Sequence, residues 1–324
     1  MTAAQLIIEY LSEHVTDPVP RFVMVREIHK EGSSSPEYVE AYERLRQSKW
    51  YRVLADEQRE DGSWGSFHSM VANTKINSKF ISTEAALRRA RELSLPKDDP
   101  VVAKAVRLME RYVRGEQEYP DRVEKHNDGG RGFMIAIPFL VAGNLNLFDP
   151  DNLLLGSLRE VYLKTLKVAF AKGDFDEEAW ERGRLGNGGP VFQAWNMYHL
   201  WLLQNANCMD DTLQRQYLGY IWKRKAGVFY LSDFPPAEKK SLEDRNFFVW
   251  LSILECLSGF SLFPEFMRED ALPHLLVEVD RLIHGEIAMT APSLHYVRCA
   301  ESRRDKHARN ADVVLRIARV LVRC

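Results

Sequence analysis

The sequence has no long hydrophobic run and none of the marks of a secretion signal. No stretch reaches the roughly 18 apolar residues needed to span a bilayer, and the longest apolar candidate, residues 247–263, is interrupted by Glu255 and several serines. Residues 1–15 contain an apolar patch without a basic start or a small-residue cleavage site, which is typical of an amphipathic helix. We therefore expect no transmembrane segment, and this leaves peripheral membrane contact open.

Cysteine is scarce and shows no pairing pattern. The four cysteines are Cys208, Cys256, Cys299 and Cys324. They lie far apart and form no CxxC pattern, so we expect reduced thiols in a cytoplasmic protein. His295 and Cys299 are four residues apart, with His307 nearby, and could contribute to a zinc site. No Asp-x-Cys pattern accompanies them and such groupings are common by chance, so we predict no metal and no cofactor.

An excess of charge of one sign is also absent. Lys and Arg total 44 against 46 Asp and Glu, which gives a net charge of −2. No basic run with interleaved aromatic residues appears, and this argues against a nucleic-acid partner. The apolar fraction of 45%, with 16 Phe, 12 Tyr and 7 Trp, is ample for one large core. Small molecules or proteins are the expected partners.

The most distinctive motif is the turn at residues 58–64, Gln-Arg-Glu-Asp-Gly-Ser-Trp. Leu54 and Gln58 lie on helical spacing, and the Asp-Gly pair then ends the helix. The Gln58 amide can bond exposed backbone at a helix end, while Gly62 permits the positive φ that such a turn usually needs. The motif predicts a clasp that fixes the end of one helix to its neighbour, and by itself it carries no chemistry.

This turn resembles the QW motif (Gln, a few residues, Gly-x-Trp) of squalene-hopene cyclases and other class II terpene cyclases. A helix opening with Thr83-Glu84-Ala85 and a second opening at Asp99-Pro100 follow it. The same order characterises one hairpin of the α/α toroid shared by terpenoid cyclases and protein prenyltransferase β subunits. The match covers roughly residues 45–115. The resemblance implies an all-α fold, an α/α toroid of about six helical hairpins in inner and outer rings.

Hydrophobic spacing, caps and breakers predict about eleven or twelve helices and no strand. The expected helices cover residues 1–14, 36–57, 83–93, 100–114, 133–141, 151–171, 191–201, 212–222, 242–258, 270–283 and 305–322, with a further one near 292–300. More apolar helices alternate with more amphipathic ones, as inner and outer rings would require. We expect one toroid domain over residues 1–324, with 1–35 as a candidate N-terminal helical extension.

The resemblance also implies acid-initiated cyclisation by an aspartic acid from a DxDD-Thr-Ala motif, in which burial keeps one carboxyl protonated. Ile81 and Ser82 stand where the family's preceding carboxylates would lie. The only Asp-Asp-Thr in the chain contains Asp210 and Asp211, with Cys208 in place of the first Asp. Asp210 would match the proton donor and Asp211 would support it. The competing and favoured interpretation is that both residues cap a helix.

A glycine-dense stretch at residues 183–190 and the aromatic helix start behind it predict a ligand pocket. The candidate substrate-binding residues are Gly188, Gly189, Trp195, Tyr198, His199 and Trp201. Glycines let the backbone approach a ligand, and the aromatic π faces could hold a carbocation or an apolar group. The alternative is that aromatic residues at helical spacing form core, with the histidine satisfied inside it. The stretch fits neither GxGxxG nor a P-loop.

These observations predict a terpene-cyclase-like protein that binds an isoprenoid or other apolar substrate in a central toroid cavity, with acid-initiated cyclisation if it is catalytic. A toroid that serves only as a binding or interaction module is one alternative. A carbohydrate-active (α/α)₆ barrel is another, in which paired carboxylates and aromatic platforms would act on sugars. An apolar cavity with one buried carboxyl favours the cyclase, whereas a polar cleft with two carboxylates favours the barrel.

Overall fold

The computed structural model describes residues 3–68, 79–121, 124, 132–186, 192–287, 299–301 and 305–324. Across these ranges the chain consists of helices and their connections, without a β-strand, and one isolated bridge joins Asn196 to Phe229. The expected all-α class is therefore confirmed for the part of the chain that is described.

The helices have the following bounds in chain order. They are α1 (Ala3–His14), α2 (Pro18–Val23), the π-helix η1 (Met24–Ile28), α3 (Pro36–Gln47), α4 (Lys49–Glu57), α5 (Thr83–Glu92), α6 (Pro100–Arg114), α8 (Gly132–Phe148), the 3₁₀ turn η2 (Leu153–Leu155), α9 (Gly156–Ala169), α10 (Glu177–Gly186), α11 (Met197–Leu203), α12 (Asp211–Lys223), α13 (Phe247–Leu257), α14 (Phe263–Phe266), the π-helix η3 (Met267–Ala271), α15 (Leu272–Ile283) and α16 (Lys306–Leu321).

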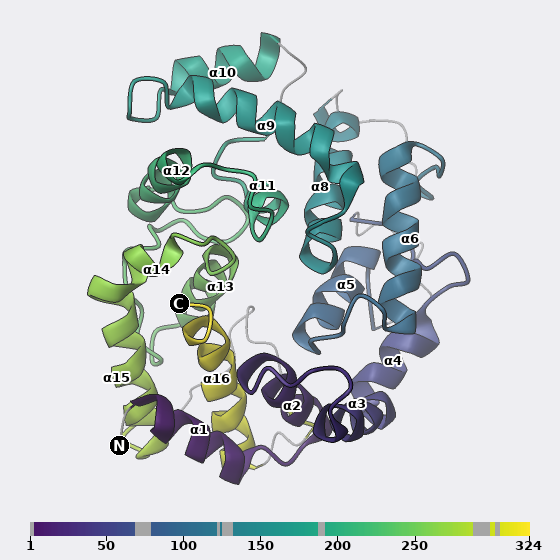
Figure 1. Cartoon of the computed structure of the whole chain (residues 1–324), viewed down its shortest axis with the longest axis vertical. Helices are drawn as coiled ribbons and strands as arrows, with labels where there is room; N and C mark the ends of the chain where they lie inside the picture. Colours follow the sequence, from purple (N-terminus) through teal and green to yellow (C-terminus); the bar gives the residue numbers. More distant parts are fainter. Residues whose placement is uncertain are drawn as a thin grey trace.

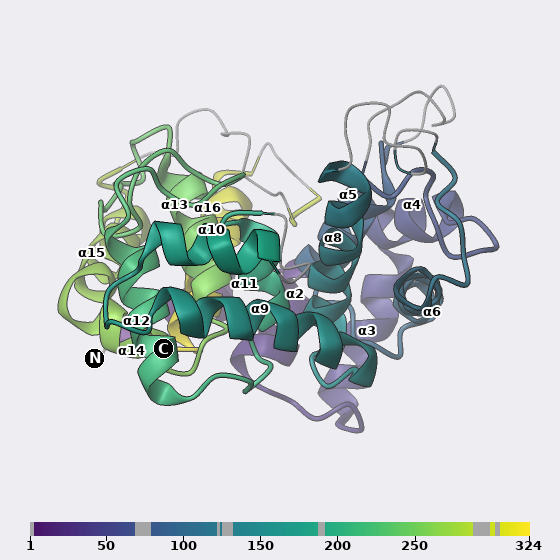
Figure 2. The same cartoon turned by 90° about the horizontal axis from the view of Figure 1, so that it is seen from above.

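The helices follow one another around a ring, and the last helix returns to the first (Figure 1). α1 packs against both α15 and α16, while α16 also packs against η1 and α13. Inside the ring lie α2 with η1, α5, α8, α11, α13 and α16, and the remaining helices lie outside them. Seen from above, α9 and α10 run side by side across the outside of α8 and α11 (Figure 2).

The glycine turn after α4 joins two neighbouring helices. Gln58 Nε2 donates to the carbonyl of Val101 in the first turn of α6 at 2.8 Å and to the carbonyl of Gly62 at 3.1 Å. Gly62 has φ +96°, and a Cβ there would lie 2.5 Å from the carbonyl oxygen of Lys104 in α6. Only glycine allows both this backbone conformation and this close approach. The predicted clasp is confirmed.

The tryptophan of the same turn extends the clasp to α5. Trp64 Nε1 donates to the carbonyl of Leu54 in α4 at 2.9 Å. The Trp64 backbone N–H donates to the hydroxyl of Thr83, the first residue of α5, at 3.0 Å. Both groups are buried, so these hydrogen bonds satisfy polar atoms that water cannot reach. The clasp therefore sets where α5 begins, and α5 carries several residues that face the interior of the ring.

Three sequence expectations are wrong at the level of elements. The single helix expected over residues 36–57 is two helices, because Ser48 is extended and its hydroxyl caps α4 through Tyr51 N. No separate helix is predicted between residues 14 and 36, yet this segment contains α2 and η1. No helix is predicted between residues 171 and 191, yet α10 lies there and extends into the glycine-dense stretch as far as Gly186.

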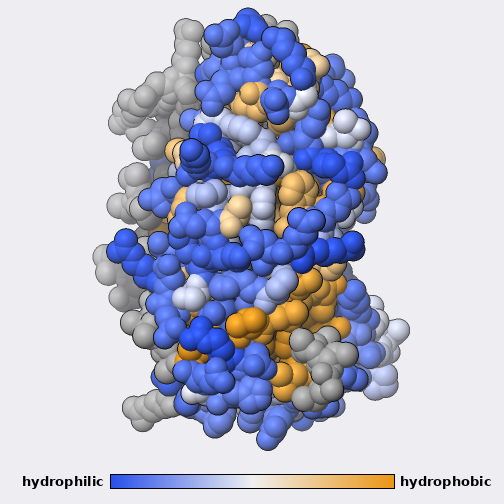
Figure 3. All heavy atoms as spheres, turned by 90° about the vertical axis from the view of Figure 1, so that its left-hand side faces the viewer, coloured by the Kyte–Doolittle hydropathy of each residue, from blue (hydrophilic) through white to orange (hydrophobic). Residues whose placement is uncertain are grey.

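The outer face over α15 is mainly hydrophilic, with a hydrophobic area toward its lower end (Figure 3). α1 and the end of α15 lie there (Figure 1), and each exposes a large apolar side chain, Ile8 in α1 and Val277 in α15. Within the described ranges, no helix combines the length and the apolar character that crossing a membrane would require.

Candidate functional site

A cavity of about 1220 Å³ lies inside the ring. Residues of α2 and η1, α5, α8, α11, α13 and α16 line it, together with loop residues next to these helices. Among the described lining residues, none comes from an outer helix. The volume exceeds the roughly 300–1,000 Å³ typical of small-molecule sites. The cavity can therefore hold a substrate of substantial size together with water.

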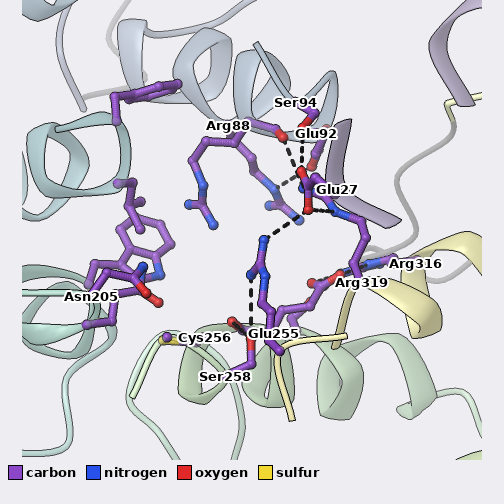
Figure 4. A pocket seen from close by; sticks show the side chains of 18 of the residues that line it. Glu27, Arg88, Glu92, Ser94, Asn205, Glu255, Cys256, Ser258, Arg316 and Arg319 are labelled. Carbon is purple, nitrogen blue, oxygen red and sulfur yellow. Dashed lines mark hydrogen bonds and ion pairs between the residues drawn. The ribbon is translucent and has the colours of Figure 1, made fainter. Parts of the chain in front are cut away.

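One wall of this cavity consists of ion pairs (Figure 4). Glu27 of η1 accepts hydrogen bonds from Arg319 at 2.8 and 2.9 Å and from Arg323 at 3.0 Å. Glu255 of α13 accepts two from Arg316, both at 2.6 Å. Burial disfavours the charged form of Glu27, but the charges of Arg319 and Arg323 outweigh it and lower its pKa to about 2. These carboxylates are therefore ionised and neutralised by arginine.

The lining of the cavity also holds a carboxylate, an imidazole and a phenol in contact. Glu84 Oε2 in the first turn of α5 lies 2.5 Å from His68 Nδ1, and the Tyr198 hydroxyl of α11 lies 3.4 Å from the same nitrogen. Asn144 Nδ2 donates to the other Glu84 oxygen at 3.4 Å. We call Glu84, His68 and Tyr198 the acid–base cluster. All three line the cavity.

The surroundings of the acid–base cluster favour the protonated forms of His68 and Tyr198. Burial opposes protonation of His68, but the hydrogen bond and charge of Glu84 outweigh it and raise the imidazole pKa above its ordinary value. Burial, and after it the negative charge of Glu84, raises the pKa of Tyr198, so that its hydroxyl stays protonated at neutral pH. The cluster can therefore hold a proton on His68 or Tyr198 and stabilise it with Glu84.

An aromatic face continues from the acid–base cluster along the cavity wall. Tyr198 meets Trp201 edge to face with ring centroids 5.3 Å apart, and Tyr230 lies 5.7 Å from Tyr198. The guanidinium carbon of Arg91, on α5, lies 4.9 Å from the Trp201 ring centroid. Trp201 therefore contacts the acid–base cluster through Tyr198 and a cation through Arg91.

The structure separates the aromatic residues predicted to bind substrate. Tyr198 and Trp201 line the cavity, whereas Trp195 and His199 are not among the lining residues. Trp195 instead packs under the guanidinium of Arg224, 3.5 Å from its ring centroid. His199 is fully buried, as the core interpretation expects, and burial lowers its pKa to about 3. The predicted rim glycines, Gly188 and Gly189, lie outside the described residues.

The two predicted catalytic aspartates lie at the start of α12. Asp210 is the N-cap residue, and its Oδ1 accepts a hydrogen bond from Leu213 N at 2.9 Å. Asp211 follows in the first turn, and both carboxylates are exposed to solvent. Neither lines the cavity. The capping interpretation is confirmed for Asp210, while its role as a proton donor stays a prediction that this position does not favour.

The candidate zinc residues are placed only in part. His295 lies outside the described residues. The Cys299 thiol contacts the carbonyl of Glu92 at 3.7 Å, and burial raises its pKa to about 12. His307 stacks on His14 with ring centroids 4.8 Å apart. Among the residues that the structure places, no three His, Cys, Asp or Glu side chains are arranged to hold a metal ion.

Sequence reasoning did not single out Glu84, His68 or Arg91 as site residues. Glu84 and Arg91 are seven positions apart on α5, which is two turns, so they share one helix face. Both line the cavity. The available signal was that spacing, together with the clasp that positions the start of α5. Polar residues on one helix face usually point to solvent. The spacing of Glu84 and Arg91 therefore did not distinguish a cavity-lining face from a solvent-exposed face.

Comparisons with protein-family models, with curated proteins and with solved structures find no match.

Proposed function

We propose that this chain is an α/α toroid of the terpenoid cyclase type that carries out acid–base chemistry on an isoprenoid or another substrate with an apolar body. The acid–base cluster carries the proposal, because Glu84, His68 and Tyr198 meet on the cavity wall directly beside the Trp201 ring. A proton donor next to an aromatic face is what protonation of an apolar substrate requires, since the ring can stabilise developing positive charge.

The toroid part of the proposal is supported by how the cavity is lined. The lining residues come from α2 with η1, α5, α8, α11, α13 and α16, and one or two α-helices without lining residues separate each of these from the next along the chain. The clasp at Gln58 and Gly62 binds the outer helices α4 and α6 to each other, and Trp64 ties α4 to the inner helix α5. These contacts support the proposal of a toroid that the resemblance to the QW motif implies.

The cavity is more polar than the sequence argument for a cyclase assumes. Its ion-pair wall faces the same space as the aromatic face, which excludes a uniformly apolar lining. A substrate that fits both walls has an apolar body and a polar or charged end. We therefore favour a functionalised substrate over a plain hydrocarbon.

The number of carboxylates in the cavity favours a carbohydrate-active barrel. The pairing of most of these carboxylates with arginines argues against it. Arg319 and Arg323 bind Glu27, Arg316 binds Glu255, and Arg88 lies 3.2 Å from Glu92. Glycoside hydrolysis needs two carboxyl groups, one to give and one to take a proton. Of the described glutamates that line the cavity, Glu84 is the one that contacts a histidine.

The test measures binding and turnover separately. Purified protein is incubated with squalene and with prenyl alcohols and prenyl carboxylic acids, and products are identified by mass spectrometry. Glu84→Gln and Tyr198→Phe should each lower turnover by about 10²-fold or more, the usual contribution of a general acid or base. Substrate binding, followed by tryptophan fluorescence, should change far less.

Asp210→Asn compares the two candidate acids within the same experiment. Turnover lost in Asp210→Asn and kept in Glu84→Gln would overturn the assignment to the acid–base cluster. Binding without turnover by any variant, including the unaltered protein, would favour the non-catalytic binding module.

A further inference from the structure

Arg91 is a cation inside the ring without an anionic partner. Among the described residues its guanidinium forms no hydrogen bond and no ion pair within 4.0 Å, and the negative charges of Glu255 and Glu92 act on it only from a greater distance. Burial lowers its pKa to about 10, which still leaves it charged at neutral pH. Its side chain is partly buried, so the guanidinium is only partly hydrated and would gain from a counter-charge. Such a group is retained most readily where a ligand supplies the missing charge.

The other arginines of the cavity differ from Arg91 in this respect. Each contacts an acceptor in the protein: Arg26 binds Ser94, Arg88 binds Glu92, Arg316 binds Glu255, and Arg319 and Arg323 bind Glu27. The guanidinium groups of these arginines already bind acceptors within the protein. Arg91 alone among these arginines faces the cavity with its five N–H donors unused by described residues.

The geometry of Arg91 favours a carboxylate over a phosphate. Its guanidinium carbon lies over the Trp201 ring, 4.9 Å from the ring centroid, a cation–π contact that uses none of its N–H groups as hydrogen-bond donors to an oxygen. A planar fork of this kind binds one carboxylate through two parallel hydrogen bonds. A phosphate dianion would call for several available cations, and the neighbouring arginines are paired.

The position of Arg91 relative to the acid–base cluster sets the length of the ligand. Arg91 and Glu84 are seven residues apart on α5, which is about 10 Å along a helix. Trp201 contacts both Arg91 and Tyr198 of the acid–base cluster. A ligand held at Arg91 would cross the Trp201 ring and reach the cluster roughly 10 Å from its charged end.

We infer that Arg91 binds the carboxylate of an organic acid whose apolar body lies along Trp201 and whose reacting part reaches the acid–base cluster. This inference names the substrate class of the cavity and rests on the proposed function only for what happens at the far end of the ligand. Binding of the carboxylate is independent of any later proton transfer.

Binding of three ligands of equal chain length tests the inference. Decanoate, decanol and decyl phosphate are titrated into the unaltered protein below their micelle-forming concentrations, with calorimetry and tryptophan fluorescence as readouts. Decanoate should bind at least 10-fold more tightly than decanol, because one charge-assisted hydrogen-bonded pair is worth about that much. Equal affinities, or a 10-fold preference for decyl phosphate, would overturn it.

Variants of α5 then locate the binding group. Arg91→Gln should weaken decanoate binding by 10-fold or more and leave decanol unchanged, and Arg91→Lys should be intermediate because it loses the fork. Arg89→Gln is the matched control, since Arg89 also stacks on a tryptophan, Trp50, but does not line the cavity. Equal effects of Arg89→Gln and Arg91→Gln would refute the site.

The comparison of the three ligands needs no variant, so it decides the question even if Arg91→Gln does not fold. Failure of the acid–base proposal would show as decanoate binding without turnover of any substrate. Failure of the carboxylate inference would show as turnover of neutral substrates with no preference for the acid.

Discussion

His199 shows at the scale of one residue how burial decides the state of a titratable group. Its Nδ1 lies 3.1 Å from the carbonyl oxygen of Gln193, while Nε2 is buried and has no hydrogen-bond partner among the described residues. Tyr162 and Phe139 pack around the ring, with centroids 4.2 and 5.6 Å away. Protonation would place an unpaired charge in this apolar surrounding, so the imidazole is neutral and serves the core.

We predict that His199 makes the fold sensitive to mild acid. Its pKa falls from 6.5 to about 3 on folding, so the unfolded chain takes up the proton first as the pH falls. This group's contribution is therefore complete above pH 6.5 and is lost at about 1.4 kcal/mol per pH unit below it. Urea unfolding at pH 7 and pH 5 should show a smaller acid-induced loss in His199→Phe, by about 2 kcal/mol. An unchanged difference would contradict this account.

The sequence predicts individual site residues only where the residue type is uncommon on a solvent-exposed surface. Tyr198 and Trp201 stand out because large aromatic residues crowd one helix start, and both line the cavity. Arg91 and Glu84 give no such signal, because a helix with a charged face toward a cavity has the same sequence pattern as a helix with a charged face toward solvent. Only the arrangement of the helices in the ring shows whether the charged face of a helix points to the cavity or to solvent.

At the scale of elements, the clasp between α4 and α6 depends on one glycine. We predict that Gly62→Ala lowers the free energy of unfolding by about 3 kcal/mol or more, through a positive φ and an overlap with backbone. Gly115→Ala is the matched control, since Gly115 also has a positive φ, +71°, but a Cβ there meets nothing within 4 Å. It should cost about 1–2 kcal/mol. Equal losses in urea unfolding would show that the close approach to Lys104 is unimportant.

Helix boundaries were predictable where a capping side chain marks them. Ser82 caps α5 through Ala85 N, and Asp99 caps α6 through Val101 N, as the sequence signals indicate. α2 escaped notice because Pro18 and Pro20 look like a connection. Both prolines stand in the first turn of a short helix, where no intrahelical N–H donor is needed, so the chain can coil there.

At the scale of the whole molecule, closure of the ring joins residues that are distant in the sequence. Glu27, in η1, binds Arg319 and Arg323 at the other end of the chain, across 292 and 296 residues. α1 and η1 also pack on α16. Contacts of this separation have no local sequence signal, and a pairing of Glu27 with α16 follows only once the ring is known. The N-terminal helices are thus held in place by the last helix.

We predict that Glu27→Gln destabilises the closed ring by about 3–5 kcal/mol, because it leaves Arg319 buried without a counter-charge. The pKa of Glu27 falls from 4.5 to about 2 on folding, so its contribution is complete above pH 4.5 and is lost as the pH falls toward 2. Glu265→Gln is the control, since Glu265 pairs with Arg215 at the half-exposed surface and should cost less than about 1 kcal/mol. Urea unfolding at pH 7 and between pH 5 and 3 measures both effects. The prediction is wrong if both variants lose the same stability and keep the same acid dependence. The Glu27 ion pairs would then not hold the two ends of the chain together. Packing of α1 on α15 and α16 would close the ring instead.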